Sequence, residues 1–424
     1  MNTTIILALL ILIGLGAPVA ISLGLAAIYG IDQFTRLPMI LVAQRMFAGI
    51  DSFPLMAVPL FILAGNLMAA GGISLRLVEF ARALVGNVQG GLAASCVVTC
   101  MIFAAVSGSS VATTFAIGAI LIPAMVRNGY PKPTAAAIQA TSAELGVLIP
   151  PSIPLILYGV ATETSIGQLF IAGFGPGLLV AFALIVFLLL YCRLRGIGNE
   201  ASDTRVPLGP AAFRASAALI MPVIVVGGIY GGVFTPTEAS AVAVAYALLV
   251  GTVFYRELTW PAFVKVLRDT AIATAVVMLI IAAAALFSFV ITRMGLPAMA
   301  TNWVRDAFTS PFTFLLAVNL FLFVVGMFIE TAAAILVLAP ILAPMAIAFG
   351  VDPVHFGLIM VINLATGMIT PPVGVNLFAA CTVAKLPIER IIPALLPLFA
   401  VMIACVFIVT YVPVVSLGLR DLLY

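Results

Sequence analysis

The stretch AAVSGSSVATTF, residues 104–115, places a polar tip of Ser107, Gly108, Ser109 and Ser110 inside a long apolar segment. The tip divides residues 91–126 into two arms, 91–106 and 111–126. Each arm would form about 24 Å of helix, which is shorter than the roughly 30 Å hydrocarbon core of a bilayer. Two short arms that meet at a polar tip predict a re-entrant hairpin, which enters and leaves a membrane by the same face. The alternative is two ordinary crossings joined by a tight turn.

The composition of the chain supports a membrane location for this segment. Of the 424 residues, 64% are hydrophobic and 8% are charged, whereas a soluble globular protein is typically about 25% charged. Apolar runs of about 20 residues, each long enough to cross a bilayer as a helix, recur from end to end. The sequence therefore predicts an all-α polytopic membrane protein.

Outside the two apolar regions that carry tips, the sequence predicts nine full crossings. The first is expected to be a transmembrane helix rather than a signal peptide, because it has no basic start and its apolar run is too long. The crossings are expected near residues 4–31, 53–71, 133–161, 169–191, 215–234, 238–255, 270–292, 356–384 and 391–417.

The distribution of Lys and Arg predicts an orientation. With both hairpins re-entrant, 13 of the 18 basic residues fall on one side and five (Arg36, Arg45, Arg293, Arg305 and Arg420) on the other. The positive-inside rule assigns the richer side to the cytoplasm. We therefore expect a cytoplasmic N-terminus, an external C-terminus and a cytoplasmic linker at 193–214.

An internal repeat relates the two halves of the chain, 1–192 and 215–424. At an offset of 221 residues, identical residues coincide without a gap, and an offset of 223 aligns the earlier segments. The coincident pairs are Pro123 with Pro344, Gly129 with Gly350, Gly146 with Gly367, Pro150 with Pro371, Pro38 with Pro261 and Gly72 with Gly295. An ordered set of this kind indicates duplication.

The two repeats are expected to have opposite orientations in the membrane, because equivalent elements are separated by an odd number of crossings, five. Inverted repeats are typical of secondary transporters, in which two halves alternate about a central site. Under the overlay, the tip at 107–110 corresponds to Phe328–Thr331. A second hairpin is therefore expected at 312–349, entering from the opposite side.

A broken helix follows each hairpin, at 133–161 and at 356–384. Pro150-Pro151 and Pro371-Pro372 interrupt the backbone hydrogen bonding of these helices. Such a break leaves carbonyl and N–H groups at membrane depth, where protein, water or a ligand must satisfy them. A proline kink relieved by neighbouring side chains is the alternative, but its repetition beside two polar tips favours binding sites.

Each repeat is expected to supply one set of oxygen ligands for a small hard cation, since such ions prefer several oxygen atoms. Glu330 is the most informative candidate, because a lone acid at membrane depth is by default a functional residue; a hydrogen-bonded structural acid is the alternative. The first set is Ser107, Gly108, Ser109 and Ser110 with Gly146 and Pro150, and the second is Glu330 and Thr331 with Gly367 and Thr370.

An anionic substrate is expected where the second halves of the broken helices begin. Helix N-termini present N–H groups and a positive dipole end to an anion. The candidate substrate ligands are Ser152, Gly374 and Asn376 at these starts, with Ser109 and Glu330 from the tips.

Several functions are excluded or disfavoured by what the sequence lacks. No GxxxxGK[ST] motif is present to bind ATP phosphates, and HExxH is missing. One histidine, His355, cannot build a zinc site or a serine triad, and we expect it to lie solvated in an external loop. We expect no enzyme activity, no organic cofactor and no nucleic-acid partner.

The chain resembles the large membrane subunit of TRAP (tripartite ATP-independent periplasmic) transporters along nearly its whole length. The resemblance rests on SGSSVATTFAIGAILIPAM, GVLIPPSIPLILYG, GGIYGGVFTPTEASAVAVAYAL, GMFIETAAAILVLAPILAPMA and GMITPPVGVNLF. It implies an elevator-type transporter in a bacterial inner membrane, with a small four-helix membrane subunit and a periplasmic substrate-binding protein as partners. It also implies sodium-coupled import of a carboxylate, sugar acid or keto acid.

The resemblance also implies roles for individual residues. Ser107, Gly108, Ser109 and Ser110 match the sodium-binding tip of the family, and Ser152 matches a polar position beside the substrate. Glu330 differs from the aspartate that is commoner at the second tip, so its direct ligation of an ion is open. The alternative function is a stand-alone sodium-coupled carboxylate transporter that needs no binding protein.

Overall fold

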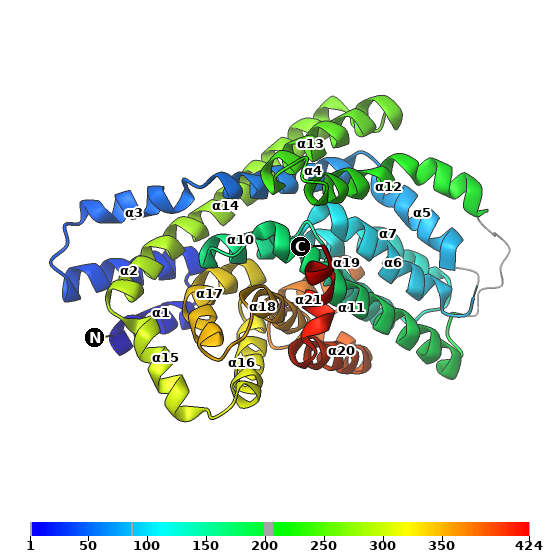
Figure 1. The fold of residues 1–424 in the computed structure, drawn as a ribbon. Helices are drawn as coiled ribbons and strands as arrows, with labels where there is room; N and C mark the ends of the chain where they lie inside the picture. The colour runs from blue at the N-terminus through cyan, green and yellow to red at the C-terminus, as the bar shows by residue number, and fades with distance from the viewer. Residues whose placement is uncertain (1, 86–87, 199–206, 424) are drawn as a thin grey trace.

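In the computed structural model, residues 2–85, 88–198 and 207–423 are described, and every regular element in them is helical (Figure 1). In the described part of the chain, eight helices are long and apolar enough to cross a membrane. A ninth span results if Lys132–Leu148 and Ile153–Thr162, which meet at 41°, are counted as one. The predicted all-α membrane fold is confirmed.

The first half of the chain consists of a short-helix region, a hairpin, a broken helix and a long helix. Its elements are α1 (Asn2–Gly14), α2 (Val19–Phe34), α3 (Ile40–Ile50), η1 (Phe53–Met56), α4 (Ala57–Ala70), α5 (Ile73–Val85), α6 (Gly91–Ser107), α7 (Ser110–Arg127), α8 (Lys132–Ala143), α9 (Leu145–Leu148), α10 (Ile153–Thr162) and α11 (Ile166–Arg195).

The second half repeats this order. Its elements are α12 (Leu208–Tyr230), α13 (Pro236–Leu249), η2 (Val250–Phe254), α14 (Trp260–Arg293), α15 (Leu296–Ala307), α16 (Pro311–Gly326), α17 (Thr331–Ala348), α18 (Pro353–Met368), α19 (Val375–Ala384), α20 (Ile388–Tyr411) and α21 (Pro413–Leu423).

The helix bounds reproduce the sequence repeat. Helices α7 and α17 both have 18 residues and coincide at the offset of 221, whereas α10 and α19 both have 10 residues. The 34-residue α14 corresponds to α3, η1 and α4 together. Each repeat thus contains a helical hairpin, α6–α7 or α16–α17, followed by a broken helix.

Helix packing also follows the repeat. Helix α2 packs on α14, and its equivalent α13 packs on α4. The amphipathic helices α5 and α15 contact the hairpins α6–α7 and α16–α17, respectively. In Figure 1, α4, α13 and α14 run along the upper part of the molecule, and the hairpins and broken helices lie beneath them. We call α2, α3, α4, α12, α13 and α14 the frame, and the hairpins with α8–α10 and α18–α19 the core.

The predicted single crossing at 4–31 is wrong, because the chain folds back on itself between α1 and α2. Gly16 has a φ of +81°, and Pro18 cannot continue the helical hydrogen bonding. A Cβ on Gly30 would lie 2.6 Å from Ile5 Cδ1 and 3.0 Å from Val290 Cγ1. The start of α1 therefore lies near the Arg293 end of α14, not at the opposite end as the predicted orientation required.

The last predicted crossing, 391–417, also differs from the structure. Helix α20 ends at Tyr411, and a separate amphipathic helix, α21, begins at Pro413. A Cβ on Gly175 of α11 would lie 1.7 Å from the Val415 carbonyl oxygen, so α21 rests directly on α11. Of the predicted linker 193–214, residues 199–206 lie outside the described part, residues 193–195 belong to the end of α11, and residues 208–214 belong to the start of α12.

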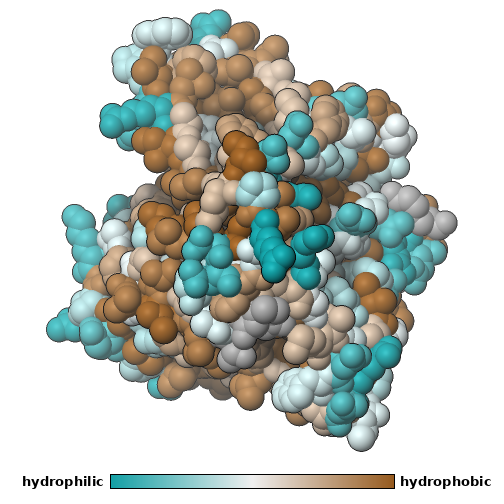
Figure 2. Space-filling view, turned by 90° about the vertical axis from the view of Figure 1, so that its left-hand side faces the viewer, coloured by the Kyte–Doolittle hydropathy of each residue, from teal (hydrophilic) through white to brown (hydrophobic). Residues whose placement is uncertain are grey.

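The lateral surface of the molecule is apolar. Large side chains within the spanning helices, such as Phe182 and Leu190 of α11 and Val223 of α12, are 69%, 53% and 69% exposed, as expected for residues that face lipid rather than water. Figure 2 views the end of the molecule at the left of Figure 1, where hydrophilic residues lie between broad hydrophobic areas. Polar residues at this end fit the boundary between lipid and water.

Candidate functional site

Each hairpin tip is bonded to the broken helix of its own repeat. In the first repeat, the N–H of Ile153 donates to the carbonyl oxygen of Gly108 at 3.2 Å. In the second, the N–H of Gly374 donates to the carbonyl oxygen of Met327 at 3.1 Å. The donors 153 and 374 are related by the repeat offset of 221 and the acceptors 108 and 327 by 219, so the two bonds lie at corresponding places in the repeats with acceptors that differ by two positions.

The first tip is a compact cluster of hydroxyl groups. Ser109 caps α7, and its carbonyl oxygen accepts a hydrogen bond from the Thr113 hydroxyl at 2.8 Å. The Ser107 and Thr113 hydroxyl oxygens are 3.1 Å apart. Ser107 and Ser110 are buried, with 3% and 1% exposure. Sequence reasoning missed Thr113, although its position four residues after Ser109 places it on the same face of the helix start.

The first break lies directly against this tip. A Cβ on Gly146 would lie 2.7 Å from the Ser109 carbonyl oxygen and 2.9 Å from Thr113 Oγ1. The N–H that would bond the Gly146 carbonyl in a regular helix belongs to Pro150, which has none. The structure thus brings the predicted ligands Ser107, Ser109, Ser110 and Gly146 together, in a place rich in oxygen atoms.

In the second repeat, the hairpin and the broken helix touch at two glycines, Gly326 and Gly367. A Cβ on Gly367 would lie 2.5 Å from the Gly326 carbonyl carbon. Thr331 is fully buried, and its hydroxyl donates to Met368 Sδ at 2.8 Å. The Gly367 carbonyl accepts from the Thr370 N–H at 2.8 Å. The predicted ligands Thr331, Gly367 and Thr370 therefore lie near the contact between the second hairpin and the second broken helix.

Glu330 caps the N-terminus of α17. Its carboxylate accepts from the N–H groups of Ala332 and Ala333 at 3.1 and 3.3 Å, and the side chain is only partly buried. Carboxylates at helix N-termini are stabilised by these bonds and by the helix dipole. Glu330 therefore fixes the start of α17 at the second tip, and its contact with an ion or a substrate stays a prediction.

The predicted substrate ligands Ser152 and Asn376 are fully buried and bonded within the protein. Ser152 donates to the Val147 carbonyl at 2.6 Å and caps α10 by accepting from the Leu155 N–H at 3.4 Å. Asn376 donates to Glu144 Oε1 at 2.7 Å and to the Ala140 carbonyl at 3.1 Å. Both therefore hold the breaks in place, and their contact with a substrate stays a prediction.

The Glu144–Asn376 bond joins the two repeats. Asn376 Oδ1 also accepts from the hydroxyl of Thr114 in α7, so the first hairpin, the first break and the second broken helix meet at one amide. Sequence reasoning missed Thr114. For Glu144, the sequence shows only that an acid lies beside the first break. The sequence separation of 232 residues between Glu144 and Asn376 hides this contact from local patterns.

Two adjacent cavities of about 480 and 530 Å³ lie between α14 of the frame and α17 of the core. Both are lined by Ala161, Ser288, Thr292 and Pro340. None of the predicted ion or substrate ligands lines either cavity. The cavities therefore lie between frame and core, away from the hairpin tips.

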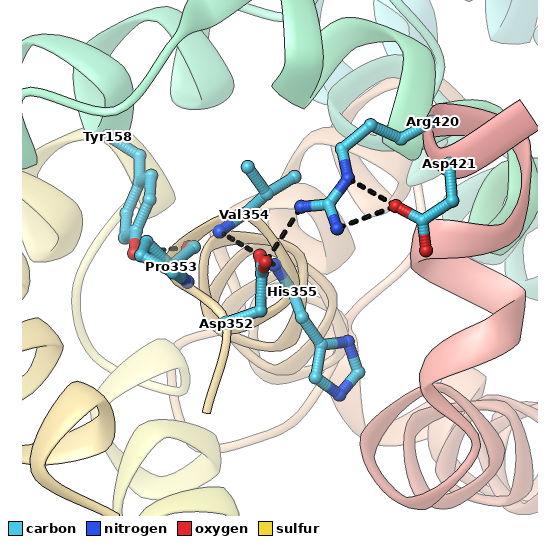
Figure 3. Close-up of polar contacts among 7 residues, drawn as sticks. All are labelled: Tyr158, Asp352, Pro353, Val354, His355, Arg420 and Asp421. Atoms are coloured by element: carbon cyan, nitrogen blue, oxygen red, sulfur yellow. Dashed lines mark hydrogen bonds and ion pairs between the residues drawn. The ribbon is translucent and has the colours of Figure 1, made fainter. Parts of the chain in front are cut away.

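An ion pair between Asp352 at the start of α18 and Arg420 of α21 lines the first cavity. Asp352 caps α18 by accepting from the Val354 and His355 N–H groups, and it pairs with Arg420 of α21 at 2.8 Å (Figure 3). Burial favours the neutral acid, but the hydrogen bonds from Arg420 and from the backbone prevail and hold the pKa of Asp352 below its ordinary value.

The expectation that His355 is solvated is wrong, because the side chain is only 3% exposed. Its Nε2 lies 3.2 Å from the carbonyl oxygen of Thr410 in α20. Thr410 also belongs to a buried network in which Asn319 donates to its hydroxyl at 3.1 Å and Asn363 donates to Asn319 at 2.8 Å. As the third residue of α18, His355 is carried inward by the helix rather than outward by a loop.

Comparison with known sequences identifies a family. The profile described as "Tripartite ATP-independent periplasmic transporter, DctM component" matches residues 5–415. The chain is 43% identical to the C4-dicarboxylate TRAP transporter large permease protein DctM of Pseudomonas aeruginosa, over 94% of each chain. It is 39% identical to the sialic acid TRAP transporter large permease protein SiaM of Vibrio cholerae, over 91% of this chain and 92% of that one.

A further relative is longer than this chain. The isethionate TRAP transporter permease protein DctMQ of Oleidesulfovibrio alaskensis is 46% identical over 95% of this chain, which spans 64% of the relative. Among solved structures, the YdaH transporter of Alcanivorax borkumensis matches with a TM-score of 0.68 and 14% identity, over 91% of this chain and 90% of that one. The fold is therefore that of a known transporter.

Proposed function

Because the chain belongs to the family of large membrane subunits of TRAP transporters, we propose that it imports an organic acid anion together with sodium ions. A periplasmic binding protein captures the anion and delivers it. The substrate is a carboxylate, sugar acid or keto acid, in keeping with the C4-dicarboxylate and sialic acid named for two relatives.

The observation that carries sodium coupling is the backbone hydrogen bond between tip and break in each repeat. Each bond holds a glycine-containing helix break against a polar tip, so backbone carbonyls and hydroxyl groups converge at two places. Such groups suit a small hard cation without a large burial penalty. The two sites are not chemically equivalent, since the first has serine hydroxyls and the second has the carboxylate of Glu330.

The proposed transport step is an elevator movement of the core against the frame. The amphipathic helices α5 and α15 connect frame to hairpins at equivalent places, and two cavities lie beside the contact between α14 and α17. Sodium that enters an inside-negative cell contributes about 2.3 kcal/mol per charge per 100 mV. This contribution offsets the cost of importing an anion against the same potential.

The proposed assembly contains two partners and spans the bacterial inner membrane. The small membrane subunit has four helices, and the fused name DctMQ of one relative supports a permanent association with it. By the positive-inside rule, the end with Arg293 and Arg420 faces the periplasm. Since the start of α1 lies near the Arg293 end, we place both chain ends on the periplasmic side.

Reconstituted transport tests this function directly. Large and small subunits in proteoliposomes should take up a C4-dicarboxylate or sialic acid only with an inward sodium gradient and the cognate binding protein. Uptake without the binding protein would support the alternative, a stand-alone sodium-coupled carboxylate transporter. Uptake that is independent of sodium would contradict the proposal.

A further inference from the structure

Two arginines without an acidic partner line the second cavity, which is the larger of the two cavities between frame and core. Its volume is about 530 Å³, and its wall includes Arg45 of α3 and Arg293 of α14. Among the residues that the structure describes, no Asp or Glu lines this cavity, and none forms an ion pair with either arginine. Two unpaired cations therefore share one cavity.

Packing between α3 and α14 fixes the place of the two arginines. A Cβ on Gly49 would clash with the Ala285 Cβ, so α3 rests directly on α14. One turn further along α14, the guanidinium carbon of Arg45 lies 4.0 Å from the centre of the Phe289 ring. Arg293 follows Phe289 by four residues and therefore lies on the same face of α14. Stacking uses the face of the Arg45 guanidinium group and leaves the N–H groups at its edge for a ligand.

The rest of the wall suits a small organic acid. Ser288 and Thr292, one turn apart on α14, contribute hydroxyl groups, and the other lining residues are apolar. Binding sites for small molecules are typically cavities of about 300–1,000 Å³ with mostly apolar walls and a few polar groups that fix the orientation of the ligand. Arginine binds a carboxylate through two parallel N–H donors. The cavity therefore fits a carboxylate group on a short carbon skeleton.

The adjoining first cavity has a different charge. Its wall contains Glu163, Asp352 and Arg420. Arg420 is already paired with Asp352 and with Asp421, at 2.8 and 2.7 Å. Its charge is therefore compensated within the protein, and Glu163 repels an anion there. Binding of a carboxylate is favoured in the second cavity and not in the first.

The internal repeat shows that the core packs differently on the two sides of the frame. A Cβ on Gly65 of α4 would lie 3.1 Å from Ser107 Cα, so the frame contacts the first hairpin tip. By the offsets of 223 and 221, the equivalent contact would join Ser288 to Phe328. Ser288 instead lines both cavities, and the side chain of Phe328 is 54% exposed. The opening between frame and core therefore lies toward the Arg293 end of α14, which the proposed orientation places at the periplasm.

We propose that the second cavity is an anion-binding site, in which Arg45 and Arg293 hold the carboxylate of the transported acid before it reaches the hairpin tips. The inference rests on the proposed function and adds to it a binding site on the periplasmic side. The carboxylate exchanges its bound water for the N–H donors of the two arginines, and no covalent bond changes. A lipid phosphate presents anionic oxygen atoms of the same kind, so the experiments separate these two sources.

An introduced cysteine measures the charge of the cavity, because all five native cysteines are buried. In Ser288→Cys, assembled with the small subunit in nanodiscs, a negatively charged thiosulfonate should react about tenfold faster than a positively charged one, since a charged cleft concentrates counter-ions. Both rates are divided by those with free cysteine. Adding Arg45→Gln and Arg293→Gln should remove the preference, whereas Arg36→Gln, at an exposed position before α3, should keep it. A preference that survives the loss of both arginines would overturn the site, as would Ser288→Cys and Thr292→Cys that react with neither reagent.

Protection from labelling identifies what the site binds. Succinate, pyruvate and sialic acid represent the three proposed classes of substrate, and at least one should slow the reaction of Ser288→Cys with an uncharged thiosulfonate until the effect saturates. Succinamide, the neutral analogue of succinate, should not protect, and Arg45→Gln with Arg293→Gln should abolish the protection. Protection by none of the three acids would overturn the site. Protection that is present in phosphatidylcholine nanodiscs and lost with phosphatidylglycerol would assign the arginines to a lipid phosphate and contradict the proposal.

Transport measurements separate this inference from the proposed function. In proteoliposomes with the small subunit and the binding protein, the double variant Arg45→Gln, Arg293→Gln should take up substrate several-fold more slowly, with an unchanged sodium concentration for half-maximal uptake. Wild-type uptake in this variant would overturn the role of the site in transport. A wild type without sodium-dependent uptake would instead overturn the proposed function. The labelling experiments need neither sodium nor the binding protein, so they decide on the anion site separately.

Discussion

Gly367 of the second broken helix and Gly326 of the second hairpin are in direct backbone contact. A Cβ on Gly367 would lie 2.6 Å from Gly326 Cα, and a Cβ on Gly326 would lie 2.7 Å from the Leu364 carbonyl oxygen. No side chain fits on either surface, so the oxygen groups of the second site depend on two residues without a Cβ. The corresponding first-repeat contact, between Gly146 and the Ser109 carbonyl, is of the same kind.

Gly367→Ala should therefore separate the second tip from its break. We expect a destabilisation of about 1–3 kcal/mol, typical of overpacking, and a loss of sodium-dependent uptake. Gly24→Ala is the matched control, since a Cβ on Gly24 of α2 meets nothing within 4 Å. Thermal unfolding and uptake measured on both variants check the prediction, and wild-type behaviour of Gly367→Ala would contradict the contact.

Ser109→Ala should weaken sodium binding at the first tip. The substitution removes a hydroxyl from the oxygen cluster and also removes the cap of α7. We expect uptake to require far more sodium while the subunits still assemble. Ser165→Ala removes a comparable cap from α11, outside the site, and should leave the sodium dependence unchanged. An unchanged sodium dependence in Ser109→Ala would argue against this ligand.

Glu330→Gln should separate the two roles of this side chain. The amide oxygen can still accept from the Ala332 and Ala333 N–H groups, so the cap of α17 should persist, but the negative charge is lost. We expect normal assembly and a lower affinity for one sodium ion, measured by the sodium dependence of uptake. Glu330→Asp should keep the charge and most of the affinity. If Glu330→Gln has the wild-type dependence, the acid is structural.

The Asp352–Arg420 pair should make stability dependent on pH in the acid range. The pKa of Asp352 is lowered in the folded protein. The ion pair therefore adds fully to the free energy of unfolding above the ordinary pKa of 3.8. This stabilisation is lost as the pH falls through the lower pKa of the folded protein. Asp352→Asn should lower the unfolding free energy at neutral pH by up to about 1 kcal/mol, as for exposed ion pairs. The difference from the wild type should vanish in acid; a constant difference would show that the pair is not responsible.

Cysteine labelling should establish the orientation. All five native cysteines are buried, so an introduced cysteine dominates the labelling of intact cells by an impermeant reagent. A cysteine at Asn302 should react from the periplasm, and one at Asn128 only after the membrane is opened. Both positions are exposed in the structure. The reverse pattern would overturn the orientation drawn from the basic residues.

Much of this fold could be predicted from the sequence, because local chemistry decides it. The polar tip at 107–110 lies where α6 ends and α7 begins, as predicted, and the second tip predicted at 328–331 lies between α16 and the start of α17. The fold-back between α1 and α2 was missed, since Gly16 and Pro18 interrupt an apolar run that otherwise has the length of one crossing. Close contacts such as Glu144 with Asn376 depend on packing between distant segments, which periodicity does not report.

Simultaneous fluxes of radioactive sodium and of labelled substrate into proteoliposomes test the central claim most directly. With the small subunit and the binding protein present, substrate should draw sodium inward. At the sodium concentration that suffices for the wild type, Ser109→Ala and Gly367→Ala should each lose most of this linked sodium flux. Substrate uptake without any accompanying sodium, in the wild type under the same gradient, would contradict sodium coupling at the two tips.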